Sequence, residues 1–193
     1  LGDVYKRQGK DNVLAVRLEN RPQSSRWYPG AGLYRNVHLV TTERVHVPVW
    51  GTQLTTPHVS AEYASVRLRT TIRNAGDADV RISTDIIAPD GKIVARKDNS
   101  RKINHGQPFE QNFLINAPSL WSPETPYLYK AVSKIYVDGK QTDEYTTRFG
   151  IRSIEIIADK GFFLNGKHRK FQGVCNHHDL GPLGAAVNVA ALR

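Results

Sequence analysis

The sequence contains no methionine and a single cysteine, Cys175, among its 193 residues. One thiol cannot close an internal disulfide, so no disulfide framework supports this chain. Cys175 lies in an apolar-rich segment, and we predict a small buried side chain rather than a nucleophile, which would need a base beside it. Because a natural chain starts with methionine, we expect the sequence to be an internal fragment of a longer protein.

Long apolar runs are also missing. No stretch approaches the roughly 20 apolar residues of a membrane helix, and no basic segment followed by an apolar one marks a secretory leader. With 39% hydrophobic and 23% charged residues, the composition is that of a globular chain. We expect no membrane partner, and the sequence leaves the compartment open.

Acidic residues are in the minority, since 18 Asp and Glu face 27 Lys and Arg, giving a net charge of +9. A basic balance can indicate nucleic-acid binding. The positive charges are scattered, however, and Arg67, Arg69 and Arg73 alternate with apolar residues, as on a solvated strand face. We therefore expect no nucleic-acid partner.

Alternation of apolar and polar residues with a period of two dominates from Asp11 onward and predicts β-strands. The expected strands cover Leu14–Leu18, Val37–Leu39 and a central series near residues 66–72, 80–86, 93–95, 109–115, 127–137 and 142–149. The pairs Asp90-Gly91 and Asp138-Gly139 are hairpin signals between them. Short strands at regular spacing predict an antiparallel, immunoglobulin-like sandwich that lacks the paired cysteines of true immunoglobulin domains.

The last part of the chain changes character after an Asn165-Gly166 turn. The run Phe171–Cys175 is predicted to be a strand, and Ala185–Leu192 is predicted to begin a helix. A strand, a loop and a helix form the opening unit of an α/β fold. If that strand is the first of a (β/α)₈ barrel, the residues after it lie on the face where barrel active sites are built.

Those residues are Asn176, His177, His178 and Asp179. A metal site is disfavoured, because adjacent side chains on extended backbone point to opposite sides and metal pairs use other spacings. Two interpretations stay open: polar groups that satisfy a tight loop, or a barrel-edge cluster that hydrogen-bonds sugar hydroxyls.

A second cluster surrounds Arg26 and Trp27, where aromatic and guanidinium groups suit the faces and hydroxyls of sugars. Packing of one domain on another is the competing interpretation, and from the residues alone we favour it. Glycoside hydrolysis needs a pair of carboxyl groups beside the scissile bond. The seven glutamates all occupy positions typical of exposed sandwich residues, and Asp179 alone does not make a pair.

Three stretches together resemble glycoside hydrolase family 2, in particular the β-galactosidases. The run from Arg26 to Val37 resembles the end of the family's N-terminal sugar-binding jelly roll. Leu120–Tyr129 and Arg148–Arg152 resemble the end of its immunoglobulin-like domain. Phe163–Lys167, followed by Gly173–Asp179, resembles the entry into its catalytic barrel.

The resemblance implies a mainly β chain in three parts. Residues 1–46 would be the C-terminal part of the jelly roll, with residues 1–8 foreign to the rest. Residues 47–157 would be the sandwich, with Pro48 near the boundary, and residues 158–193 the start of a TIM-barrel catalytic domain. The sandwich would act as a scaffold between its neighbours.

By resemblance, the longer protein would be a retaining, exo-acting hydrolase of terminal β-linked sugars, with β-galactosides first and β-glucuronides or β-mannosides next. Its acid/base and nucleophilic glutamates would lie downstream, so this chain alone should be inactive. His177 matches a family histidine that hydrogen-bonds the sugar. Asn176 and Asp179 are its neighbours, and Ser25 replaces an aspartate of some relatives, a role that Arg26 or Tyr28 could take.

No cofactor or metal ligand is carried over to this chain, although a divalent cation and a homo-oligomer are compatible with the longer protein. Enzymes of this kind are often periplasmic or secreted. The alternative function is a non-catalytic β-sandwich that binds carbohydrate or protein through the Trp27 loop.

Overall fold

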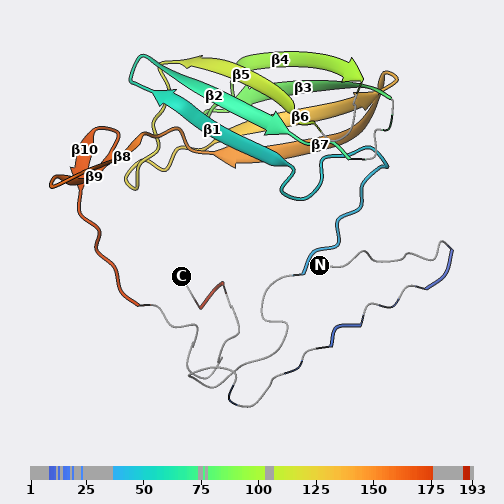
Figure 1. Ribbon diagram of the computed structural model, residues 1–193, viewed down its shortest axis with the longest axis horizontal. Coiled ribbons are helices and arrows are strands. Elements are labelled where there is room, and N and C mark those ends of the chain that lie inside the picture. Colours follow the sequence, from blue (N-terminus) through green and yellow to red (C-terminus); the bar gives the residue numbers. More distant parts are fainter. Residues whose placement is uncertain are drawn as a thin grey trace. The chain divides into compact units, whose positions relative to one another are not determined.

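A computed structural model describes residues 9–11, 13, 15–17, 19, 23, 37–73, 76, 78–102, 107–175 and 189–191. Across these ranges the chain forms ten β-strands and no helix (Figure 1). Val40–Gln172 forms one compact unit, and Leu1–Leu39 with Gly173–Arg193 forms a second. Among the described residues, no apolar helix has the length needed to span a bilayer.

Seven strands of the larger unit form two antiparallel sheets. They are β1 (Thr52–Val59), β2 (Tyr63–Thr70), β3 (Asp79–Ile87), β4 (Ile93–Lys102), β5 (Phe109–Asn116), β6 (Tyr129–Val137) and β7 (Lys140–Phe149). One sheet has the order β1-β2-β5 and the other β4-β3-β6-β7. The chain passes from one sheet to the other after β2, β4 and β5, so both sheets must form together. The predicted sandwich is confirmed.

The hairpin signals of the sequence form turns that need a left-handed backbone. Asp138 and Gly139 connect β6 to β7 with φ of 49° and 79°, the pattern that matches the twist of two paired strands. Gly91, with φ 88°, follows Asp90 in the turn between β3 and β4. Both predicted hairpins are therefore confirmed.

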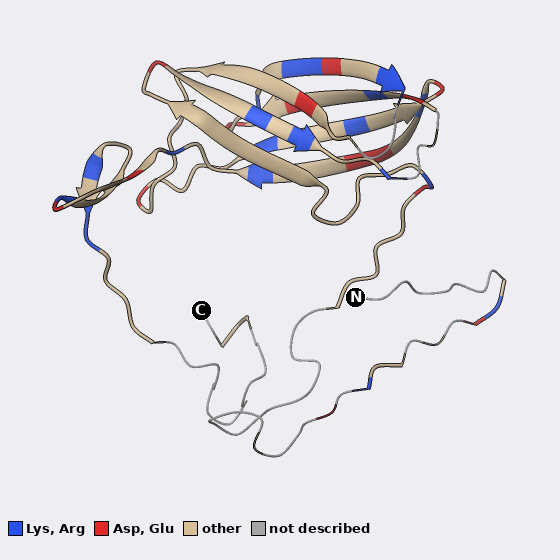
Figure 2. Cartoon of the chain, viewed as in Figure 1, with Lys and Arg blue, Asp and Glu red and all other residues tan. Residues whose placement is uncertain are grey.

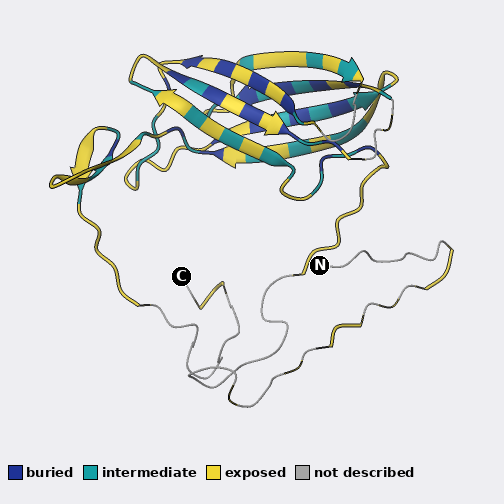
Figure 3. Ribbon diagram, viewed as in Figure 1, coloured by how far each residue is buried: buried dark blue, intermediate teal, exposed yellow. Residues whose placement is uncertain are grey.

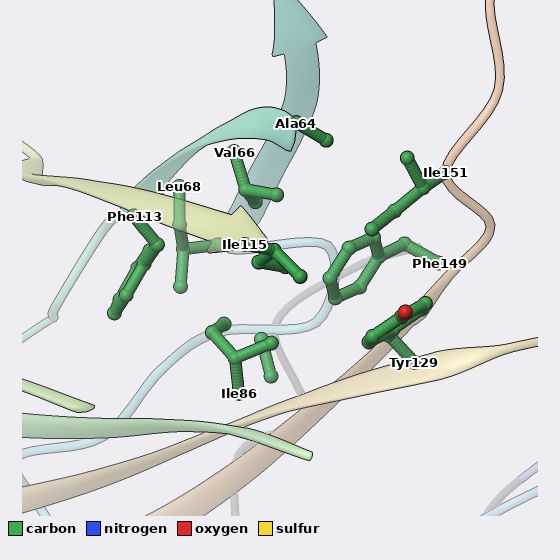
Figure 4. Close-up of a cluster of buried hydrophobic side chains, with 10 residues drawn as sticks. Ala64, Val66, Leu68, Ile86, Phe113, Ile115, Tyr129, Phe149 and Ile151 are labelled. Atoms are coloured by element: carbon green, nitrogen blue, oxygen red, sulfur yellow. The ribbon is translucent and has the colours of Figure 1, made fainter. Parts of the chain in front are cut away.

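The sandwich core consists of two apolar clusters. The larger cluster draws on strands of both sheets, including Leu68, Phe113, Tyr129 and Phe149 (Figure 4). The smaller cluster contains Val45, Val47, Ile72, Val80, Ile82, Phe109 and Ile135. Buried and exposed residues alternate along β2, β3, β5 and β6 (Figure 3), as the period of two predicted.

A buried polar group crosses the core. Gln111 of β5 is fully buried, and its Oε1 accepts a hydrogen bond from the Thr84 hydroxyl of β3 at 2.6 Å. The Thr84 and Ser133 hydroxyls lie 2.9 Å apart. The Gln111 amide nitrogen donates to the Lys97 carbonyl at 3.1 Å. Gln111 lies on β5 in one sheet, whereas Thr84 and Lys97 lie in the other. The two hydrogen bonds that Gln111 makes with them therefore tie the sheets together.

The segment before β1 is attached to the sandwich. His46 forms an isolated bridge with Arg73, and the Val47 amide donates to the Asp143 carboxylate of β7 at 2.7 Å. Val45 and Val47 are buried in the smaller cluster. The three-part division at residues 46 and 157 stays a prediction.

A small sheet follows β7. It has the order β10-β9-β8 and contains β8 (Ile154–Ile157), β9 (Gly161–Leu164) and β10 (Lys167–Arg169). Asn165 and Gly166 form the turn between β9 and β10 with φ of 50° and 72°, as the sequence predicted.

Three predicted strands are not formed by the residues that the structure describes. Residues 15–17, 37–39 and 171–175 belong to no strand, because a strand needs a ladder partner and these residues have none there. Cys175 is exposed, so its predicted burial is wrong. Nearby, the Phe171 and Phe162 ring centroids lie 4.6 Å apart, but Phe171 and Val174 are themselves exposed. Residues 189–191 form a turn, and the rest of the predicted helix lies outside the described residues.

Candidate functional site

Trp121 lies in the connection between β5 and β6, which runs from one sheet of the sandwich to the other. The Trp121 amide donates a hydrogen bond to the Ile151 carbonyl at 2.8 Å, which attaches the connection to the segment after β7. A turn follows at once, in which Ser122 and Thr125 exchange backbone hydrogen bonds of 3.0 and 3.1 Å. The connection is therefore bonded at Trp121 to the segment after β7, and a hydrogen-bonded turn follows directly after Trp121.

Gly150 allows Trp121 to approach the chain after β7. A Cβ at position 150 would lie 2.9 Å from the Cβ and Cγ atoms of Trp121, a distance at which something must move. On the same segment, the guanidinium carbon of Arg152 lies 4.9 Å from the centroid of the indole. A cation over an aromatic face is favourable, so Gly150 and Arg152 together fix the orientation of the ring.

Asn165 connects this assembly to the small sheet. Its side-chain nitrogen donates to the Trp121 carbonyl, and its side-chain oxygen accepts from the Ser153 amide, both at 3.0 Å. The backbone of Asn165 has φ 50°, a left-handed conformation that asparagine tolerates better than most residues. One side chain thus satisfies backbone groups of two separate segments.

Arg169 of β10 adds an ion pair to the same assembly. Its two terminal nitrogens donate to the two carboxylate oxygens of Glu124 at 2.6 and 2.8 Å. These hydrogen bonds lower the pKa of Glu124 from 4.5 to about 2. A bidentate pair fixes direction as well as distance, so β10 is aligned with the loop that carries Trp121.

We call this assembly the Trp121 junction and define it by Trp121, Glu124, Gly150, Arg152, Asn165 and Arg169. It brings together the segments 120–129, 148–152 and 163–167, which carry the family resemblance, and adds Arg169 just after them. The junction has the chemistry of a structural anchor: a glycine contact, an amide bridge and an ion pair. It fixes the small sheet on the sandwich, and so fixes where the chain leaves β10.

Among the described residues, the carboxyl groups with resolved pKa shifts lack the raised pKa of a catalytic acid. All seven glutamates are exposed, as predicted: Glu19, Glu43, Glu62, Glu110, Glu124, Glu144 and Glu155. Every resolved carboxyl pKa shift among the described residues is downward, in Glu62, Asp85, Asp90 and Glu124. A general acid of a glycosidase needs the opposite, a raised pKa.

One groove of the sandwich is large enough for a small ligand. It has a volume of about 470 Å³, and its lining includes Asp90, Asn116, Ser119, Tyr127 and Tyr129. Its single carboxylate, Asp90, accepts the Lys92 amide, which is the main cause of its lowered pKa. The groove therefore lacks the carboxyl pair that hydrolysis of a glycoside needs.

The residues that the sequence predicted for sugar binding are His177, Asn176, Asp179, Arg26 and Trp27. All five lie outside the described residues, as do Ser25 and His178, so these assignments stay predictions. Within the described part of the chain, no group of three or more His, Cys, Asp or Glu side chains could hold a metal ion.

The comparisons with known proteins agree on one family. The model of the glycosyl hydrolases family 2 matches residues 47–152. A β-galactosidase of Bacteroides ovatus is 43% identical over 98% of this chain, which corresponds to 23% of that protein. A putative β-glucuronidase of Formosa agariphila is 36% identical over 98% of this chain and 18% of its own length. The chain thus spans less than a quarter of these relatives.

Solved structures agree with the sequence relatives. A glycosyl hydrolase family 2 member from Bacteroides cellulosilyticus is 38% identical and superimposes with a TM-score of 0.77 over 86% of this chain and 22% of that one. A β-glycosidase from Bacteroides vulgatus gives a TM-score of 0.75 at 32% identity, over 84% of this chain and 20% of its own. With the family model covering the sandwich and the Gly150 segment of the junction, this chain belongs to glycosyl hydrolases family 2.

Proposed function

We propose that the chain is part of a longer retaining glycoside hydrolase that removes terminal β-linked sugars, with β-galactosides as the first substrate class. The observation that carries the proposal is the Trp121 junction, in which three motif segments meet and set the direction of the chain after Arg169. Identity of 43% with a protein named as a β-galactosidase supports the choice of sugar. The relatives named as β-glucuronidases make β-glucuronides the next substrates to test.

In this proposal the chain positions the domains around the sugar site and does not itself cleave the glycosidic bond. Residues 1–46 would end a jelly roll, residues 47–157 form the scaffold, and residues 158–193 begin a (β/α)₈ barrel. Two glutamates located after this chain would act as nucleophile and as acid/base, because retaining hydrolysis uses a pair of carboxyl groups on either side of the bond.

His177 would hydrogen-bond the sugar beside the bond that breaks, with Asn176 and Asp179 next to it. Such a donor stabilises charge more strongly in the transition state than in the bound substrate. Arg26 and Trp27 would approach the same sugar from the jelly roll. The junction supports this role, since it anchors β10, the last strand before these residues.

The test uses the protein encoded by the complete gene and a panel of 4-nitrophenyl β-glycosides: galactoside, glucuronide and mannoside. The proposal predicts the highest kcat/KM for the galactoside. It also predicts a loss of about 100-fold in kcat/KM for His177→Ala, with a smaller change for the control His58→Ala on β1. Turnover of none of the three glycosides would refute the proposed activity, and an unaffected His177→Ala variant would refute the assigned role.

A further inference from the structure

Trp50 occupies an unfavourable backbone conformation in the turn before β1. The turn closes with a hydrogen bond from the Gly51 amide to the Pro48 carbonyl at 2.7 Å. Trp50, the residue before Gly51, has φ 58°, in the left-handed region that glycine enters freely and bulky residues avoid. The Thr71 amide donates to the Gly51 carbonyl at 2.8 Å, which ties the turn to the segment after β2. The conformation is therefore imposed by the fold.

Within the described residues, burial does not compensate for this strain. The Trp50 side chain is 84% exposed. Its neighbour Gly51 is explained by sterics, because a Cβ there would lie 2.7 Å from the Pro48 carbonyl oxygen. Position 50 would also suit glycine, yet it carries the largest side chain. Strained residues of this kind are concentrated at functional sites.

A hollow of about 300 Å³ lies beside this turn. Its lining combines the indole with groups that can donate and accept hydrogen bonds. The residues that line it together with Trp50 include Thr52, Gln53, Arg69, Thr71 and Pro108. An aromatic wall with a few polar groups is the usual composition of a small-molecule site.

Arg69 carries the formal charge among the described residues that line the hollow. It donates to the Gln53 side-chain oxygen at 3.4 Å, and its Nε lies 4.0 Å from a carboxylate oxygen of Glu110, its register partner on β5. Glu110 lies outside the lining and is also 3.7 Å from Arg67 Nε, so it compensates each guanidinium only in part. Figure 2 shows acidic and basic segments on the neighbouring strands β5 and β2. The hollow therefore offers a guanidinium beside neutral amide and hydroxyl groups, all of which can bond to hydroxyl groups of a ligand.

We propose that this hollow is a sugar-binding subsite for a pyranose. One face of the sugar ring, which carries C–H groups, packs on the exposed face of Trp50, since an aromatic face is electron-rich. Arg69 donates to ring hydroxyls, and the Gln53 amide orients them. The subsite shares no residue with the Trp121 junction or with the residues assigned to hydrolysis. It therefore does not rest on the proposed function.

The experiment measures lactose binding to the chain of residues 1–193 by saturation-transfer NMR titration. We expect millimolar binding of lactose. Trp50→Gly should weaken lactose binding by about tenfold or more, whereas Trp50→Phe should retain part of it. The control is Val49→Ala, in the same turn but outside the hollow, which should change binding by less than about twofold.

Thermal unfolding of the same variants separates binding from packing. Trp50→Gly removes the backbone strain, so its unfolding temperature should equal or exceed that of the wild type. A fall of several degrees would identify Trp50 as a packing anchor and overturn the proposal. Lactose binding that survives Trp50→Gly would place the sugar elsewhere, and no lactose binding by the wild type would also overturn it.

Discussion

Arg169 on β10 and Glu124 in the connection before β6 are joined by two parallel hydrogen bonds of 2.6 and 2.8 Å, although 45 positions separate them in the sequence. Both ends of the pair lie on short, exposed elements with little apolar burial of their own. The small sheet therefore depends on directional contacts at the Trp121 junction more than on a hydrophobic core. Its stability should respond to changes in those contacts.

The ion pair predicts a pH dependence. The pKa of Glu124 is about 2 in the folded chain against an ordinary 4.5. A lowered carboxyl pKa stabilises the fold at pH values above the unfolded pKa, and this contribution is lost as the pH falls through the folded pKa. Glu124→Gln should therefore lower the unfolding temperature by roughly 1–3 °C near pH 7, and the difference should vanish between pH 4.5 and 2.

Circular dichroism melts at a series of pH values test this. Glu155→Gln on β8 is the matched control, because it removes an exposed carboxylate of the same small sheet outside the Trp121 junction, and it should change the unfolding temperature less. A Glu124→Gln difference that persists unchanged at pH 2 would contradict the role of the ion pair.

Gly150→Ala tests the close contact with Trp121. The added Cβ would lie 2.9 Å from the Cβ and Cγ atoms of Trp121, so the indole or the chain after β7 must shift. Overpacking of this kind costs about 1–3 kcal/mol, measured as the free energy of unfolding in urea. Gly173→Ala is the control, since its Cβ would meet nothing within 4 Å, and we expect a change below about 0.5 kcal/mol there. Equal effects of the two substitutions would show that the contact is unimportant.

Asn165 combines a hydrogen-bonding role with a backbone role, and two variants separate them. Asn165→Gly keeps the left-handed turn accessible but removes the bonds to Trp121 and Ser153, at a cost of about 1–3 kcal/mol in unfolding free energy. Asn165→Ala should cost more, because it adds backbone strain at φ 50°. Hydrogen exchange of the Ser153 amide should accelerate in both variants. Protection equal to the wild type would rule out the side-chain bridge.

Thr84→Val should destabilise the sandwich, because it leaves the Gln111 side-chain oxygen unpaired inside the core. We expect a loss of about 1–3 kcal/mol in urea unfolding. The double variant Thr84→Val with Gln111→Leu should cost less than the sum of the two single changes, by about 0.5–3 kcal/mol, since the two side chains are hydrogen-bonded. Strict additivity would show that the cross-sheet bond carries no coupling.

Sequence patterns predicted the sandwich because each signal there is local. Alternation predicted the strands that became β2, β3 and β5, and in the structure Gln111 lies with Phe109 and Phe113 on the buried side of β5. Asp-Gly pairs such as Asp138-Gly139 predicted the hairpins, since only a few residue types accept the left-handed backbone. The exposed glutamates followed from the same alternation.

The same patterns failed where a partner decides the outcome. Val37–Leu39 and Phe171–Cys175 have strand-like sequences, but alternation does not tell whether a neighbouring strand is present. The burial predicted for Cys175 failed for that reason. The contact between Glu124 and Arg169 was not predicted, because the two residues are distant in sequence. Gly150 and the Asn165-Gly166 turn were the local signals that the sequence did contain. Trp50 was passed over because exposure and φ cannot be read from residue type.

In the proposed function, this chain would position the sugar site of a longer β-galactoside hydrolase whose bond-cleaving carboxylates lie elsewhere. The direct measurement is 4-nitrophenol release from 4-nitrophenyl β-galactoside, by the purified chain of residues 1–193 and by the protein of the complete gene, side by side. We predict turnover by the complete protein and none above buffer by the chain. Clear turnover by the chain alone, or none by the complete protein, would contradict the claim.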